Sequence, residues 1–154
     1  MVIYAFNAFT PAARQPLLLM SAFSTIVILM SLFCFAALLN NKAATLNELK
    51  RYDDAEENWK NAIEILKKVG YHDGEIAISL VMLDHLTFDR DDTAYEQVEA
   101  LLDEAWDYLN SDNQPKDGNY AYVLRKCAPS FDYFRLPMEA QALRDVAKEI
   151  YERG

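Results

Sequence analysis

Residues Leu17–Leu39 read LLLMSAFSTIVILMSLFCFAALL and contain no charged residue, no glycine and no proline. A helix of this length spans roughly 35 Å, which exceeds the roughly 30 Å hydrocarbon core of a bilayer. Thirteen of the 23 residues are Leu, Ile, Val or Phe, whose summed insertion free energy has an upper bound of roughly −4 to −8 kcal/mol. The stretch therefore predicts a transmembrane helix, which we assign to residues 16–39 with Pro16 in its first turn.

Two other interpretations of the apolar run stay open at this point. A cleaved signal peptide, which would release a secreted domain, has an apolar core of about 7–15 residues behind a basic start. This run is longer, only Arg14 precedes it, and Phe35-Ala36-Ala37 is a poor cleavage site. A buried helix of a soluble protein is the other interpretation. We favour an uncleaved anchor over both.

One side of the predicted membrane helix carries small and hydroxylated residues at helical spacing. Such a stripe permits close approach of a second membrane helix. In the alternative interpretation, each hydroxyl bonds back to the backbone of its own helix. We favour the packing role and assign it to Ser21, Ser24, Thr25, Ile28 and Ser31.

Charge divides the chain into two unlike parts. All 24 acidic residues and 14 of the 15 basic ones follow Leu39, so the part after the apolar run has a formal charge of −10. This balance argues against binding nucleic acid or lying on anionic lipid, and it suits a surface that meets other proteins. Arg14 on one side, with Lys42, Lys50 and Arg51 on the other, favours the cytoplasmic side for this second part.

The chain is expected to form a tail at residues 1–15, the membrane helix at 16–39 and one helical domain at 40–154. Gly70 and the loop Ser111–Gly118 predict breaks between helices. The membrane helix is expected to continue to about Lys50. Further helices are expected at residues 53–70, 75–87, 93–110, 119–133 and 137–152.

Two of these helices have a predicted N-terminal cap. Asp53 with Glu56, and Thr93 with Glu96, have the spacing of capping boxes. Pro129 lies inside the helix expected at 119–133, where its missing N–H predicts a kink or a split.

The stretch Tyr52–Leu66, YDDAEENWKNAIEIL, has alanines at 55 and 62 and a large aromatic residue, Trp59, between them. Two antiparallel helices cross closely only where small side chains face each other. This pattern resembles the second helix of a tetratricopeptide repeat. The resemblance implies an all-α fold, with the membrane helix followed by a helical-hairpin repeat domain of about three helix pairs.

Weaker matches extend the resemblance along the chain. The distance from Ala55 to Val98 is 43 residues and that from Val98 to Ala140 is 42, whereas the family repeats every 34 residues. A plain helical bundle with coincidental alanine spacing is the alternative. The matching positions are Leu39, Ala43 and Leu46 in the first pair, Val98, Leu102 and Ala105 in the second, and Leu124, Ala128, Phe131, Ala140 and Ala147 in the third.

In this family, a groove lined by the first helix of each pair commonly binds an extended peptide or a partner helix. The resemblance therefore implies that the partner-binding residues include Asn40, Asn47, Tyr122, Arg125 and Tyr133.

Residues for catalysis are not grouped in the pattern that chemistry requires. Asp84 and His85 are adjacent on an expected helix, and His72-Asp73 lie in a loop, so we interpret both pairs as surface or boundary groups. Two histidines and two separated cysteines do not supply a four-ligand zinc site. We expect no enzyme activity, no cofactor, no bound metal and no small-molecule substrate.

These features favour a non-catalytic, single-pass membrane protein that binds other proteins. Its expected partners are the other components of a membrane complex, which it would bind through the membrane helix and the repeat domain. In that complex it is expected to be an accessory, scaffold or assembly subunit. The alternative is a receptor or co-chaperone that recruits transient client proteins at the membrane.

Overall fold

The computed structural model describes residues 11–70, 72–113 and 115–153, with side chains from residue 19 onward. These residues form six α-helices and no strand, which confirms the predicted all-α class. Residues 1–10, most of the predicted tail, lie outside the described part. The helices are α2 (Pro11–Glu48), α3 (Tyr52–Val69), α4 (Asp73–Arg90), α5 (Tyr95–Leu109), α6 (Gly118–Tyr133) and α7 (Pro137–Arg153).

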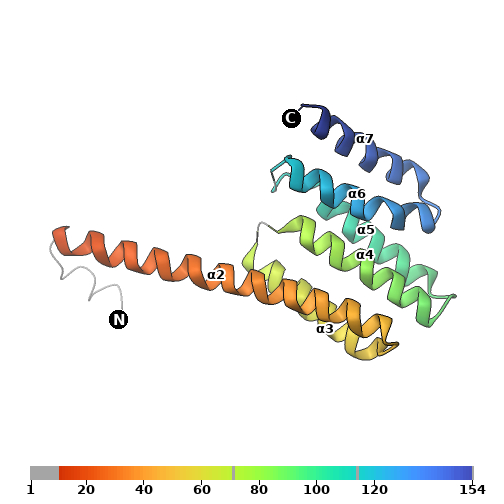
Figure 1. The fold of residues 1–154 in the computed structure, drawn as a ribbon, viewed down its shortest axis with the longest axis horizontal. Coiled ribbons are helices and arrows are strands. Elements are labelled where there is room, and N and C mark those ends of the chain that lie inside the picture. The colour runs from red at the N-terminus through yellow and green to blue at the C-terminus, as the bar shows by residue number, and fades with distance from the viewer. Residues whose placement is uncertain (1–10, 71, 114, 154) are drawn as a thin grey trace.

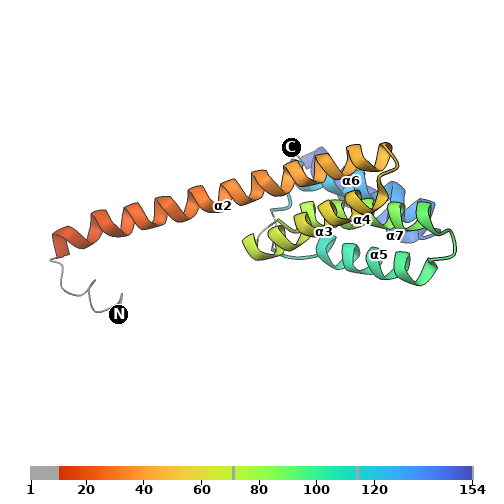
Figure 2. The same cartoon turned by 90° about the horizontal axis from the view of Figure 1, so that it is seen from below.

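The helices are arranged as three antiparallel pairs. α2 packs on α3, α4 on α5, and α6 on α7, while α4 also contacts α3 and α6 and so joins the pairs. Figures 1 and 2 show the first half of α2 extending away from the other helices. The predicted order of an apolar helix followed by helical hairpins is therefore confirmed.

α2 runs without interruption from the apolar segment into the first helix pair, as predicted. It begins at Pro11, where proline gives up no hydrogen bond, and Pro16, which we expected in the first turn, lies inside the helix. The described side chains up to Leu32 are exposed, whereas Ala36, Ala43 and Leu46 are buried against the domain. Within the described residues, α2 is one helix that is long and apolar enough to cross a membrane.

Small residues form the contact between α2 and α3. Ala43 on α2 and Ala55 and Ala62 on α3 are fully buried, and Trp59 is only 2 % exposed. Alanine at these positions lets the two backbones approach, and the indole fills the space beside them. Equivalent positions of the other two pairs are also buried, namely Val98, Leu102, Ala105, Leu124, Ala128, Phe131, Ala140 and Ala147.

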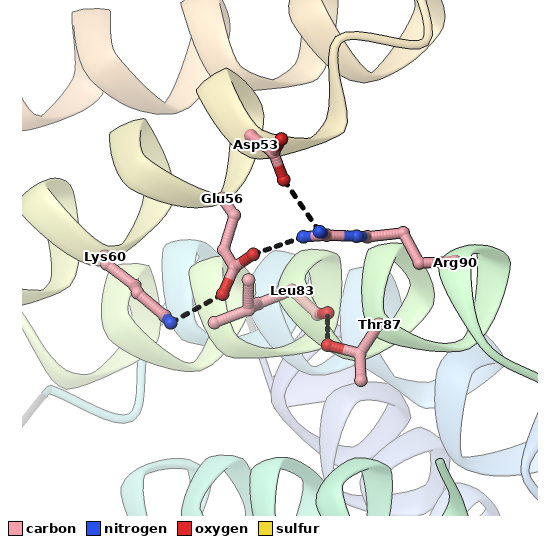
Figure 3. Close-up of polar contacts among 6 residues, drawn as sticks. All are labelled: Asp53, Glu56, Lys60, Leu83, Thr87 and Arg90. Carbon is pink, nitrogen blue, oxygen red and sulfur yellow. Dashed lines mark hydrogen bonds and ion pairs between the residues drawn. The ribbon is translucent and has the colours of Figure 1, made fainter. Parts of the chain in front are cut away.

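The capping box predicted at Asp53 and Glu56 is wrong. α3 begins at Tyr52, and its N-cap residue, Arg51, makes no side-chain capping bond. Asp53 Oδ1 instead accepts a 2.7 Å bond from the Arg90 guanidinium at the end of α4, and Glu56 accepts a second bond from it (Figure 3). These pairs tie the last turn of α4 to α3, and residues 88–90, which lie beyond the helix expected at 75–87, remain helical.

The second predicted capping box is also wrong, and a cap that we did not predict is present. α5 begins after Ala94, and the Thr93 hydroxyl donates to Asp91 Oδ1 at 2.5 Å. Asp117 caps α6, where its carboxylate accepts bonds from two backbone N–H groups of the first turn. Pro129 does not split α6, which runs through it to Tyr133.

Replacing Ala43 by leucine should destabilise the protein by about 1–3 kcal/mol, because a fully buried position leaves no room for the added atoms. Ala44→Leu makes the same change at the neighbouring, exposed residue and should cost less than about 0.5 kcal/mol. Urea unfolding of the full-length protein in detergent micelles, followed by circular dichroism, measures both. Equal stability of the two variants would contradict a close α2–α3 contact.

Arg90→Ala should lower the free energy of unfolding by about 1 kcal/mol, because it removes two ion pairs that join α4 to α3. The loss should shrink at high salt, since these groups are partly exposed. Arg153→Ala is the matched control, because its partner Glu149 lies on the same helix. The same unfolding assay at low and high salt tests this. A loss that is as large for Arg153→Ala would argue against a special role of the interhelix pairs.

Candidate partner-binding surfaces

Two of the five predicted partner-binding residues lie on α2, where it passes the domain. Asn40 is half-buried, and its Oδ1 accepts a 3.0 Å hydrogen bond from the Ser79 hydroxyl of α4. Asn47 is half-buried, and its buried Oδ1 has no hydrogen-bond partner among the described residues. Asn40 therefore helps to hold α4 against α2, whereas Asn47 retains an unused acceptor.

The other three predicted residues lie on α6 and do not form one site. Tyr122 is exposed and lies near the start of the helix. The Arg125 guanidinium lies 5.8 Å from the centre of the Tyr151 ring, on α7. Tyr133 is exposed at the end of α6, where its ring lies 5.3 Å from that of His85. The structure thus brings Arg125 to α7 and Tyr133 to α4.

All five residues of the predicted membrane-packing stripe are exposed. The Thr25 hydroxyl donates to the Ser21 carbonyl at 2.9 Å, and the Ser31 hydroxyl donates to the Val27 carbonyl at 2.8 Å. These bonds satisfy two hydroxyls inside the helix, as the alternative interpretation of the stripe expects. They also leave the small side chains uncovered, so the stripe can contact another helix.

A pocket of about 540 Å³ opens between α5 and the connection from α6 to α7. We call it the aromatic pocket. The α4–α5 and α6–α7 connections beside it lie at the end of the domain away from the free half of α2 (Figure 1). Its apolar walls are formed by Phe88, Tyr95, Leu102, Tyr133, Phe134 and Leu136, and Glu99 and Arg135 also line it.

The aromatic rings beside the pocket pack on one another. Phe88 lies edge-on to Phe134 at 5.5 Å and to Tyr133 at 6.0 Å, and the Tyr95 ring is 5.9 Å from it. Arg135, at φ 65°, turns the chain sharply after these rings. Edge-to-face contacts of this kind fix ring orientation, so the pocket is formed without a partner.

Negative charge extends along α5 from the wall of the aromatic pocket. Glu99 on its wall belongs to a set of four exposed acidic residues on one side of α5, which we call the acidic stripe: Glu96, Glu99, Asp103 and Asp107. Residues 91–115 contain no lysine or arginine. None of the four forms an ion pair within the described part of the chain.

The interpretation of Asp84 as a surface or boundary group is wrong. Its side chain is fully buried on α4, neither carboxylate oxygen has a hydrogen-bond partner among the described residues, and His85 Nε2 lies 3.9 Å from its Oδ1. Burial disfavours the charged form and raises the pKa of Asp84 to about 8. Ile76 and Leu80 precede Asp84 at intervals of four residues, and this placement on an apolar face of α4 is the pattern that could have revealed its burial.

His85 and Cys127 lie near this buried carboxyl group. His85 Nε2 lies 2.9 Å from the Ser130 hydroxyl of α6, and burial lowers the pKa of His85. Cys127 is fully buried on α6, where burial raises the pKa of its thiol to about 12; the Lys126 charge opposes this rise and the Asp84 charge adds to it. The high pKa makes Cys127 a poor nucleophile. These groups therefore pack α4 against α6.

Asp84→Asn should stabilise the protein at neutral and alkaline pH. Because the folded pKa is raised from about 3.9 to about 8, the native protein should lose stability as pH rises from about 4 to 8, by a few kcal/mol in total. The advantage of the variant should grow over that range and level off above pH 8. Asp103→Asn, at an exposed position, is the control. Unfolding curves from pH 4 to 9 measure this. A constant difference in the free energy of unfolding between Asp84→Asn and the native protein over that range would contradict the effect.

Comparison with known proteins adds no relative of known function. No protein-family model matches the chain, and no curated protein matches it in sequence. The residues and contacts of the chain itself are therefore the basis for inferring its function.

Proposed function

We propose that this chain is a non-catalytic, membrane-anchored protein-interaction module that serves a membrane protein complex as an accessory, scaffold or assembly subunit. The observation that carries the proposal is the continuity of α2. A single helix has an exposed apolar half, and its other half is the first helix of a packed three-pair domain. A joint without a break or a flexible linker would hold the domain at the membrane surface.

The exposed apolar half of α2 supports the anchor. Leu19, Met20, Phe23 and Met30 are between 64 % and 72 % exposed, although contiguous apolar surface of this extent is unfavourable in water. A bilayer would cover it. The membrane-packing stripe, with Thr25 in its middle, would meet a second membrane helix. The excess of basic residues after the span favours the cytoplasmic side for the domain.

The interaction role is supported by exposed aromatic residues on the helical domain. Tyr95, Tyr122 and Tyr133 are each more than half exposed, and tyrosine is enriched where proteins bind each other. The tetratricopeptide-like pattern of buried alanines supports the same role, because helical-hairpin domains of that kind bind proteins.

A second candidate function is a receptor that recruits transient clients. The exposure of Tyr122 favours it, because no described segment of the chain covers this side of α6. One experiment distinguishes the subunit role from the receptor role. The native membrane is extracted gently, the protein is isolated by affinity, and the proteins that accompany it are identified by mass spectrometry. A fixed set of membrane proteins at constant stoichiometry supports the subunit role, whereas varied clients at low stoichiometry support the receptor. A free monomer would contradict the subunit role.

The double substitution Ile26→Arg and Met30→Arg should release the protein from membranes. Each arginine near the bilayer centre costs about 2.5–3.5 kcal/mol, so two offset most of the favourable insertion free energy of the span. Ile26→Leu with Met30→Leu is the matched control and should stay in the membrane. Alkaline carbonate extraction followed by sedimentation measures the membrane-bound fraction. Native protein found in the supernatant would refute the anchor.

A further inference from the structure

The aromatic pocket has the size and lining of a site for a bulky apolar side chain. Its volume of about 540 Å³ falls in the range of roughly 300–1,000 Å³ that is typical of ligand pockets. Leu102 and Val98 in its lining are buried, whereas Tyr95 and Tyr133 at its edge are 64 % and 59 % exposed. Exposed tyrosines around an apolar floor are typical of the centres of protein interfaces.

The acidic stripe defines the charge of the segment that would accompany such a side chain. Glu99 belongs to both the stripe and the pocket lining. The stripe runs from Glu96 to Asp107, which is about 16 Å along the helix at 1.5 Å per residue. Its charges are of one sign and lie far enough apart for several cations of one partner segment to meet them. Arg135 is the one basic residue among those that line the pocket.

Other occupants fit this surface less well. A second copy of the chain would bring another strongly acidic domain, and like charges would oppose its approach. Anionic lipid is disfavoured for the same reason, and the connections beside the pocket lie at the end of the domain away from the free half of α2 (Figure 1). None of the described residues of α7 lines the pocket.

We propose that the aromatic pocket and the acidic stripe together bind a segment of another protein, in which a bulky apolar side chain stands beside lysine or arginine residues. The apolar side chain enters the pocket between Tyr95 and Tyr133, and the basic residues lie along α5. This surface is formed mainly by α5 and the α6–α7 connection, together with Phe88 at the end of α4 and Tyr133 at the end of α6. The inference rests on the proposed interaction function, for which it names the chemistry of one partner.

Selection from a random peptide library on the full-length protein in lipid nanodiscs tests this inference. The enriched peptides should carry Phe, Trp, Leu or Ile next to two or more basic residues. Their affinity should fall about tenfold at high salt, because the stripe is exposed. Tyr95→Ala and Glu99→Lys should each weaken binding by about tenfold or more.

Control variants make the result specific. Both substituted side chains are exposed, so the fold should persist, which circular dichroism verifies. Glu149→Lys makes the same charge change on α7 and should leave the peptide affinity unchanged. Enriched peptides that lack the apolar–basic combination, or that bind native protein, Tyr95→Ala and Glu99→Lys equally well, would overturn the proposal.

The remaining outcomes separate this inference from the proposed function. Peptides whose binding is lost with Tyr122→Ala but not with Tyr95→Ala would overturn the assignment of binding to the aromatic pocket. They would instead indicate an interaction surface around Tyr122 on α6. Enrichment no greater than that on empty nanodiscs would also overturn the pocket, and the isolation of the native complex then decides the proposed function independently.

Discussion

The close contact between α2 and α3 is the constraint on which the rest of the structure depends. Ala43, Ala55 and Ala62 have no side chain beyond Cβ and are fully buried, so the two helices can pack tightly while Trp59 fills the adjoining space. Because α2 also carries the apolar half that extends from the domain, this contact fixes the direction in which that half leaves. The direction of the apolar half of α2 therefore depends on three small side chains.

α4 connects the three helix pairs, and its burial has an electrostatic cost. It contacts α3, α5 and α6. Most faces of α4 are therefore covered, and a polar side chain on one of those faces is shielded from solvent. Asp84 is such a residue, and burial without hydrogen bonds favours its neutral form. The neighbouring His85 touches the rings of Tyr133 and Phe134 beside the aromatic pocket. Asp84, whose charged form is disfavoured by burial, is therefore the chain neighbour of a residue that contacts the rings beside the aromatic pocket.

Helix positions were more predictable from the sequence than the partners of polar side chains. Breaks at Gly70 and after Asn110 came from local backbone preferences, and both are present. Asp53 and Glu56 have capping-box spacing but bind Arg90, which is 34 residues away from Glu56. A local pattern does not reveal a competing partner on another helix. Tyr133 was predicted to bind partners, and only the structure showed that it lines a pocket with residues of α5.

The sequence by itself determined an acidic all-α protein with one apolar helix, because hydropathy, helical periodicity and net charge are sums over neighbouring residues. Burial at the predicted alanine positions follows from the same periodicity. Only the tertiary structure decided that Asp84 is buried, that Asn40 binds Ser79, and that α5 meets the α6–α7 connection to form a pocket. Those contacts join residues distant in the chain, and their register depends on how whole helices pack against one another.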